Sequence, residues 1–245
     1  MEAAFTRHLP LAGTFNVRDL GGYAAGGRET RWRRVLRADG LHRLDDTAME
    51  LLVGEGVRTI IDLRHAGELV MQPNPLNGHP NIAYHNISLF DQLAPAHAQG
   101  EDILLDLYKQ ALAQRQSAIR DVLTIIADAP DGIVLFHCTA GKDRTGIVTA
   151  LLLAIAGVEA GVIVEDYAMT GAMIAPMVEE LVAGALARGL DVEAFRPLLA
   201  AEPATMLATL EHLEQTYGSA RDYLALIGLE NSAIERLRDR LLGDQ

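Results

Sequence analysis

The sequence predicts an α/β fold, with a central, mostly parallel β-sheet flanked by helices and a helical C-terminal part. Apolar, β-rich segments at 35–37, 57–63, 82–89 and 132–137 are separated by segments of helical periodicity. That alternation is typical of strands joined by crossover helices. After Gly157 the periodicity is helical almost to the last residue.

The first half of the chain supplies most of the predicted sheet. Val35–Arg37 is a short strand, and Asp45 or Asp46 caps the helix that follows it. Residues 57–63 contain Val, Thr and two Ile, so we expect a buried central strand there. Residues 82–89 form a further candidate strand.

The second half is mainly helical. Residues 90–100 are predicted to be a loop, 101–127 a helix with a break near Gln116, and 132–137 a strand. Further helices are expected at 160–169, 173–188, 204–216, 219–227 and 230–242. We expect a single domain over 1–245, with 91–128 as a candidate lid or insert and 160–245 as the helical C-terminal part.

The amino-acid composition limits the classes of partner that the protein can bind. The formal net charge of −12 argues against general binding to nucleic acid or anionic membranes. The apolar run 146–158 is too short to span a bilayer, and the N-terminal residues lack the long apolar region of a signal peptide. We therefore expect a cytoplasmic protein, which leaves non-classical secretion open. The oligomeric state is not predicted.

The most informative segment is 137–146, His-Cys-Thr-Ala-Gly-Lys-Asp-Arg-Thr-Gly, which holds the only cysteine. A predicted strand precedes it and a buried helix follows it. Backbone N–H groups and the helix dipole converge at such a junction and bind anions. They also favour the thiolate form of a cysteine placed there. Cys138 and Arg144 thus stand where a nucleophile and a phosphate clamp would stand.

Each residue of this loop has a predicted role. Cys138 would attack phosphorus, and the planar fork of Arg144 would hold phosphate oxygens. The hydroxyl of Thr145 would donate to the Cys138 sulfur, unless it is only a helix cap. His137 would orient the loop backbone. The phosphate cradle would comprise Thr139, Ala140, Gly141, Lys142, Asp143, Arg144 and Thr145.

This loop, together with Phe15–Gly22, Leu36–Leu41, Ile61–Arg64 and Glu165–Tyr167, resembles the atypical bacterial and fungal tyrosine phosphatases, a family that includes dual- and triple-specificity enzymes. The resemblance implies a cysteine-phosphatase-like fold. It also implies hydrolysis of phosphotyrosine, often of phosphoserine, phosphothreonine and phosphoinositides, without a metal or other cofactor. The partner would therefore be a phosphoprotein or a phosphoinositide.

Three carboxylic acids compete to protonate the leaving group. Asp143 lies inside the loop, and the resemblance points to it. Asp62 ends a predicted strand that points at the same pocket, but it could instead pair with Arg64 and hold the shape of the site. Asp91 follows the strand at 82–89, where dual-specificity enzymes carry their acid.

Other functions and roles remain open in the sequence. Lys142 could accept a second phosphate, which would favour a phosphoinositide phosphatase, or it could only pack against the loop. Arg18 and Asp19 are expected to form a buried pair that supports the loop. Less favoured functions are a non-catalytic phosphate-binding module, sulfur transfer and arsenate reduction. The histidines have no spacing typical of a metal site.

Overall fold

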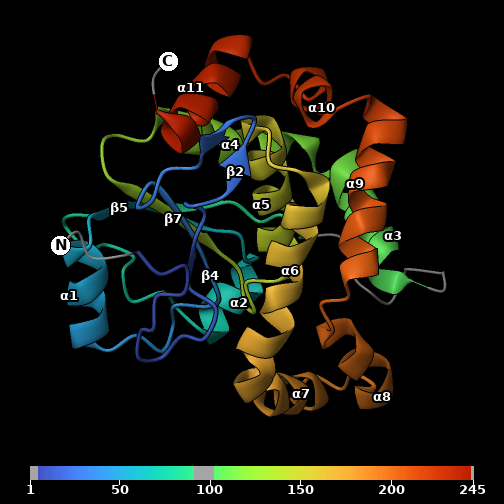
Figure 1. The fold of residues 1–245 in the computed structure, drawn as a ribbon. Helices are drawn as coiled ribbons and strands as arrows, with labels where there is room; N and C mark the ends of the chain where they lie inside the picture. Colours follow the sequence, from blue (N-terminus) through green and yellow to red (C-terminus); the bar gives the residue numbers. More distant parts are fainter. Residues whose placement is uncertain (1–4, 91–101, 244–245) are drawn as a thin grey trace.

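The computed structural model describes residues 5–90 and 102–243, and it has the predicted mixed α/β fold (Figure 1). The sheet has five strands in the order β1-β4-β7-β5-β6. Strands β4 (Val35–Ala38), β7 (Ile133–His137), β5 (Val57–Asp62) and β6 (Ala83–Asn86) are parallel. Strand β1 (Arg18–Asp19) adds to β4 in the antiparallel direction.

A two-stranded hairpin and a set of helices complete the fold. The hairpin is β2 (Ala24–Ala25) and β3 (Arg28–Glu29). The helices are α1 (Asp46–Gly54), α2 (Ala66–Met71), α3 (Ile103–Gln114), α4 (Gln116–Asp128), α5 (Asp143–Ala156), α6 (Ala160–Ile174), α7 (Val178–Ala187), α8 (Val192–Phe195), α9 (Pro203–Tyr217), α10 (Ala220–Leu226) and α11 (Asn231–Leu242), with 3₁₀ turns at Ala175–Met177 and Arg196–Leu199.

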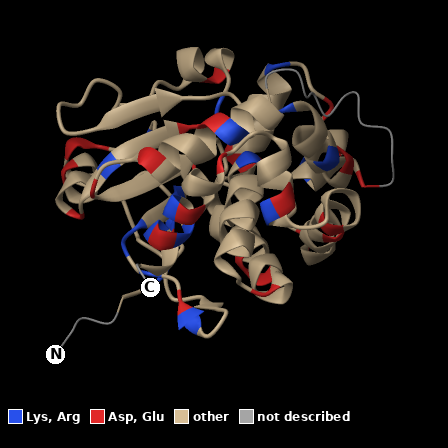
Figure 2. Cartoon of the chain, turned by 90° about the horizontal axis from the view of Figure 1, so that it is seen from above, with Lys and Arg blue, Asp and Glu red and all other residues tan. Residues whose placement is uncertain are grey.

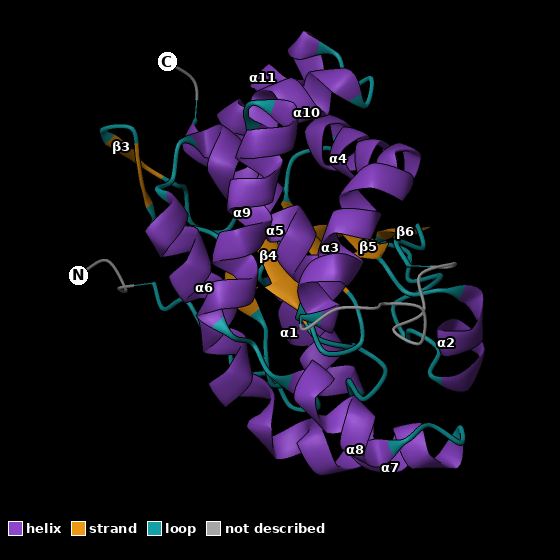
Figure 3. Ribbon diagram, turned by 90° about the vertical axis from the view of Figure 1, so that its right-hand side faces the viewer, coloured by secondary structure: helices purple, strands orange, loops and turns teal. Residues whose placement is uncertain are grey.

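The period of two along β7 divides the core between the two faces of the sheet. Val134 and Phe136 belong to the larger core, which lies against the helices above the sheet and to its right in Figure 1, among them α4, α5 and α11. Ile133 and Leu135 belong to a smaller core that includes residues of α1. In Figure 3 the helices of the larger layer stand in front of the strands. The sheet is therefore buried on both faces, as its apolar strands require.

Helix α5 follows the signature loop and is surrounded by protein. Eleven of its residues are buried, and it ends at Gly157, whose φ of 89° is the left-handed conformation that glycine adopts at a helix C-terminus. Because α5 is packed on all sides, its first turn is held firmly beneath the loop.

The predicted helix 173–188 is wrong at its start. Helix α6 continues to Ile174, a 3₁₀ turn follows, and α7 begins at Val178. Pro176 lies in that turn and has no N–H to donate to the preceding turn, so one helix gives way to the next.

By length and composition alone, the stretch Ala160–Ala187 could cross a membrane. Helices inside globular cores pass the same test. Asp166, within this stretch, is buried and paired with two arginines of the fold. Acidic and basic residues are intermixed over the elements of the fold (Figure 2).

The hairpin β2–β3 joins distant parts of the sequence. Arg28 donates to the carbonyls of Leu242, at 2.5 Å, and Gly243, at 2.7 Å. The N–H of Arg31 donates to the carbonyl of Leu241 at 2.6 Å. The end of α11 is thus held by Arg31 and by Arg28, which precedes Leu242 by 214 positions in the chain.

The candidate lid is described only in part. Residues 103–128 form α3 and α4, whose apolar faces are buried in the larger core, with the break at the predicted position near Gln116. Asp91 and most of the predicted loop 90–100 lie outside the described residues. The lid therefore stays a prediction.

Candidate active site

The signature loop lies at the carboxyl ends of β4, β5 and β7, between β7 and α5. Gly141 has a φ of 64°, and a Cβ atom there would lie 2.6 Å from the carbonyl oxygen of Ala38. Only glycine allows the loop to turn this close to β4. The turn brings the loop to the N-terminus of α5, where backbone N–H groups can bind an anion.

Cys138 is the first residue after β7 and is almost completely buried. The hydroxyl of Thr145, in the first turn of α5, donates to the Cys138 sulfur at 3.2 Å. This is the contact that the sequence predicts. A hydroxyl donor at this distance stabilises negative charge on sulfur.

Arg144 is held by a residue that the sequence analysis did not identify. Its two terminal nitrogens donate to the two carboxylate oxygens of Glu68 on α2, at 2.6 and 2.8 Å. The hydroxyl of Thr139 also donates to Glu68. Burial alone would raise the pKa of Glu68, but the hydrogen bonds and charge of Arg144 outweigh it and lower the pKa to about 2. Glu68 therefore stays charged and fixes the plane of the guanidinium.

The position of Glu68 is set by a capping box at the start of α2. The backbone N–H of His65 donates to Glu68 at 2.9 Å, while the His65 ring accepts from the N–H of Gly67 at 3.1 Å. The sequence signal was the spacing His-x-x-Glu, which differs from the usual capping box because histidine replaces serine or threonine.

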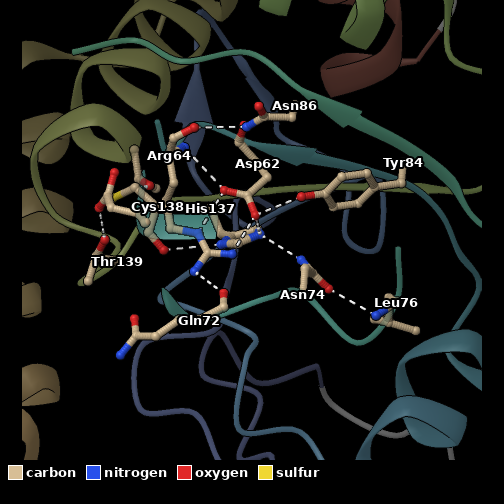
Figure 4. Close-up of polar contacts among 12 residues, drawn as sticks. Asp62, Arg64, Gln72, Asn74, Leu76, Tyr84, Asn86, His137, Cys138 and Thr139 are labelled. Atoms are coloured by element: carbon tan, nitrogen blue, oxygen red, sulfur yellow. Dashed lines mark hydrogen bonds and ion pairs between the residues drawn. The ribbon is translucent and has the colours of Figure 1, made fainter. Parts of the chain in front are cut away.

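Asp62, one of the three candidate acids, is fully buried and surrounded by donors (Figure 4). Arg64 donates to both of its oxygens, at 2.9 and 2.7 Å, and the Tyr84 hydroxyl donates at 2.9 Å. Burial opposes the charge, but His137 and Arg64 together hold the pKa of Asp62 well below its usual range. This geometry favours the structural interpretation of Asp62.

His137 is also part of this buried cluster (Figure 4). Its Nδ1 lies 3.1 Å from the carbonyl oxygen of Cys138, which can only accept, so Nδ1 carries a proton. Its Nε2 lies 3.2 Å from Asp62 and 3.0 Å from the side-chain nitrogen of Asn74. These contacts fit the predicted role of orienting the loop backbone.

Lys142 is buried at the base of the loop. Its ammonium donates to the carbonyl oxygens of Leu198 and Ala200, the latter at 2.8 Å, and lies 3.2 Å from Asp143. The ammonium is thus occupied by protein acceptors. This favours the packing role over a second phosphate site.

A buried polar cluster supports the loop from behind. The side-chain amide of Asn16 donates to the carbonyls of Ala140 and Gly141 at 3.0 and 3.2 Å. Arg37 donates to the Gly141 carbonyl at 2.6 Å, and Arg18 donates to the Asn16 side chain. These donors bind carbonyl oxygens of the loop from behind. The backbone N–H groups of the loop are therefore left to bind an anion on the opposite side.

The predicted pairing of Arg18 with Asp19 is wrong. Arg18 pairs with Asp166 on α6, and Asp19 pairs with Arg33 at 2.9 Å. Adjacent side chains on a strand point to opposite faces, so residues 18 and 19 of β1 cannot meet. The predicted support for the loop is nevertheless present, through Asn16.

We expect Asp166→Asn to lower the free energy of unfolding by about 3–5 kcal/mol, because it leaves Arg18 and Arg37 buried without their counter-ion. Burial raises the pKa of Asp166, but Arg37 and Arg18 prevail and lower it to about 2. The stabilisation that the charged Asp166 carboxylate gives the fold is therefore complete above about pH 4, the pKa of an ordinary aspartate, and is lost as the pH falls toward 2.

Urea unfolding of wild type and variant at pH 7 and pH 3 measures both effects. Glu179→Gln is the matched control, because it breaks an exposed pair with Arg196 and should leave the stability almost unchanged. An Asp166→Asn variant as stable as this control would contradict the expectation.

No group of three or more His, Cys, Asp or Glu in residues 5–90 and 102–243 could hold a metal ion. The model of a family described as "Tyrosine phosphatase family" matches residues 9–243. The chain belongs to the tyrosine phosphatase family. A tyrosine-protein phosphatase of Nostoc commune is 34% identical over 224 residues, which cover 84% of this chain and 73% of that protein.

Two further proteins are similar to this phosphatase. The triple specificity protein phosphatase PtpB of Mycobacterium tuberculosis is 28% identical, over 97% of this chain and 99% of that protein. The crystal structure of P. aeruginosa TpbA is similar over 74% of this chain and 96% of the TpbA chain, with 19% sequence identity. The TM-score between the two structures is 0.34.

Proposed function

We propose that this phosphatase hydrolyses phosphotyrosine in proteins, and phosphoserine and phosphothreonine as well, through a cysteinyl-phosphate intermediate. The observation that carries the proposal is the contact between the Thr145 hydroxyl and the Cys138 sulfur at the start of α5. The names of the Nostoc commune and Mycobacterium tuberculosis proteins support the substrate class. The name of the Mycobacterium tuberculosis protein, a triple specificity phosphatase, supports a substrate range that includes phosphoserine and phosphothreonine.

The reaction proceeds in two displacements. The Cys138 thiolate attacks phosphorus, the S–P bond forms, and the P–O bond to the substrate breaks. Water then attacks phosphorus, the S–P bond breaks, and inorganic phosphate leaves. Arg144 uses N–H groups not engaged by Glu68 to hold the equatorial oxygens, while the loop N–H groups bind the others. Thr145 stabilises the sulfur when it leaves as thiolate.

We assign the general acid to Asp143. Asp62 is fully buried, and its oxygens accept from Arg64 and Tyr84. The side chain of Asp143, in contrast, is 26% exposed beside Arg144. Asp143 protonates the leaving oxygen in the first displacement and takes a proton from water in the second. Asp91 remains an alternative that lies outside the described residues.

The phosphoinositide alternative has less support. It depended on Lys142, whose ammonium is occupied by carbonyls and by Asp143. A non-catalytic module is disfavoured because Cys138, Arg144 and Thr145 are all present. We also propose a reducing compartment such as the cytoplasm, since catalysis requires the single thiol in its reduced form.

Phosphate release from phosphotyrosine, phosphoserine and phosphothreonine peptides and from phosphoinositide vesicles tests the function. We expect the highest kcat/KM on phosphotyrosine peptides, at least about tenfold above phosphoinositides, because Lys142 is not available for a second phosphate. A phosphoinositide turned over faster than every peptide would reverse the assignment. If the folded, reduced protein released no phosphate from any of these substrates, the proposal of an active phosphatase would be contradicted.

A further inference from the structure

Tyr108, on α3, reaches the signature loop from outside it. Its side chain is fully buried, and its hydroxyl donates to Oδ1 of Asp143 at 2.6 Å. The ammonium of Lys142 lies 3.2 Å from the same oxygen. Among the residues that the structure describes, Oδ2 of Asp143 has no hydrogen-bond partner. The two oxygens of this carboxyl group therefore have different surroundings.

This hydrogen bond fixes the direction of a second one, between Tyr108 and another buried tyrosine. The hydroxyls of Tyr108 and Tyr167, on α6, are 2.8 Å apart, and the rings meet edge to face at 6.2 Å. Each hydroxyl has one proton. Because Tyr108 gives its proton to Asp143, Tyr167 must donate to Tyr108. The chain of donors runs from Tyr167 through Tyr108 to Oδ1.

Tyr108 can act only as a neutral donor. Burial, together with the nearby charge of Asp143, raises its pKa well above the usual value of 10. Burial likewise raises the pKa of Tyr167. Neither hydroxyl loses its proton near neutral pH, so the contact with Oδ1 persists while Asp143 changes its protonation state.

We propose that Tyr108 is a positioning residue that reserves Oδ2 of Asp143 for proton transfer, and that Tyr167 fixes Tyr108 in place. As the S–P bond forms and the P–O bond breaks, Oδ2–H gives its proton to the leaving oxygen. As water attacks and the S–P bond breaks, Oδ2 takes a proton from that water. Oδ1 stays bound to Tyr108 throughout, and the cycle consumes one water. This inference rests on the proposed phosphatase function, with Asp143 as acid.

The test compares Tyr108→Phe with wild type on p-nitrophenyl phosphate, whose leaving group needs little protonation, and on an alkyl phosphate, whose leaving group needs much. We expect kcat to fall about tenfold on the alkyl phosphate and less than about twofold on p-nitrophenyl phosphate, with KM unchanged on both. Tyr167→Phe should show the same pattern with a fall of about threefold. In the Asp143→Asn background, Tyr108→Phe should have no further effect.

Tyr223→Phe is the matched control, because it removes a buried hydroxyl that also holds α3, through the Leu112 carbonyl at 2.8 Å, in a hydrogen bond that does not involve Asp143. Its leaving-group dependence should equal that of wild type. Equal losses on both substrates in Tyr108→Phe, or no loss, would overturn the inference. If Tyr108→Phe fails to fold, Tyr167→Phe decides it by the same pattern.

Different results would contradict the proposed function and the positioning role of Tyr108. An inactive wild type, or an Asp143→Asn variant with equal losses on both substrates, would contradict the proposed function or its acid. If Asp143→Asn loses more activity on the alkyl phosphate than on p-nitrophenyl phosphate, but Tyr108→Phe does not, only the positioning role of Tyr108 is contradicted.

Discussion

Replacing Cys138 with serine is expected to lower kcat on a phosphotyrosine peptide by on the order of 10⁴-fold or more. A serine hydroxyl at this position is almost entirely protonated and is a much weaker nucleophile than a thiolate. The loop N–H groups and Arg144 remain in place, so the variant should still bind the phosphopeptide. Initial rates of phosphate release measure the first effect, and calorimetric titration of the peptide measures the second.

Thr209→Ser is a suitable control for this substitution. Thr209 is buried, and its hydroxyl donates to the Thr205 carbonyl on α9, within a single helix. The control should retain kcat within about twofold, as expected for a conservative change away from the site. A Cys138→Ser protein that is folded and retains more than about one hundredth of wild-type turnover would contradict the covalent mechanism.

The second large effect is expected for Arg144→Lys, which should lower kcat by about 10²–10³-fold. Lysine keeps the positive charge but loses the planar fork, so it cannot hold Glu68 through two parallel hydrogen bonds and also present N–H groups to phosphate. The loss should appear mainly in kcat, because the charge that attracts the substrate is retained. Steady-state kinetics on a phosphotyrosine peptide give the two constants separately.

Arg196→Lys is the matched control for this change. Arg196 makes an exposed pair with Glu179 at 2.9 Å, so its replacement should leave kcat and KM unchanged. If Arg144→Lys raised only KM and left kcat intact, Arg144 would bind the ground state and the transition state equally. That result would show that Arg144 does not stabilise the transition state more than the bound substrate.

The sequence predicted the loop better than its surroundings. Cys138, Arg144 and Thr145 lie within eight residues of one another, so a strand, a glycine turn and a helix start were enough to predict their meeting. Glu68, Asn16 and Asp166 reach the loop or its support from distant elements. Their roles depend on which strands are neighbours and how helices pack, and neither can be read from local periodicity.

The pairing of Arg18 shows the same limit in another way. Asp19 was the nearest acid in the sequence, yet the strand geometry of β1 sends it to the opposite face, where it meets Arg33. Asp166, the true partner, is 148 residues away. Its segment was recognised by resemblance, but nothing in the segment itself assigns Asp166 to the support of the loop.

The hairpin β2–β3 bears on how the protein reaches its native state. Because Arg28 and Arg31 bind the end of α11, these contacts must await the synthesis of residues about two hundred positions later. Bringing such distant segments together costs loop-closure entropy before any contact repays it, and this slows folding. During synthesis the hairpin stays without these partners until α11 leaves the ribosome. Until then the apolar faces of α4 and α5, against which α11 packs, are open to chaperones or to aggregation.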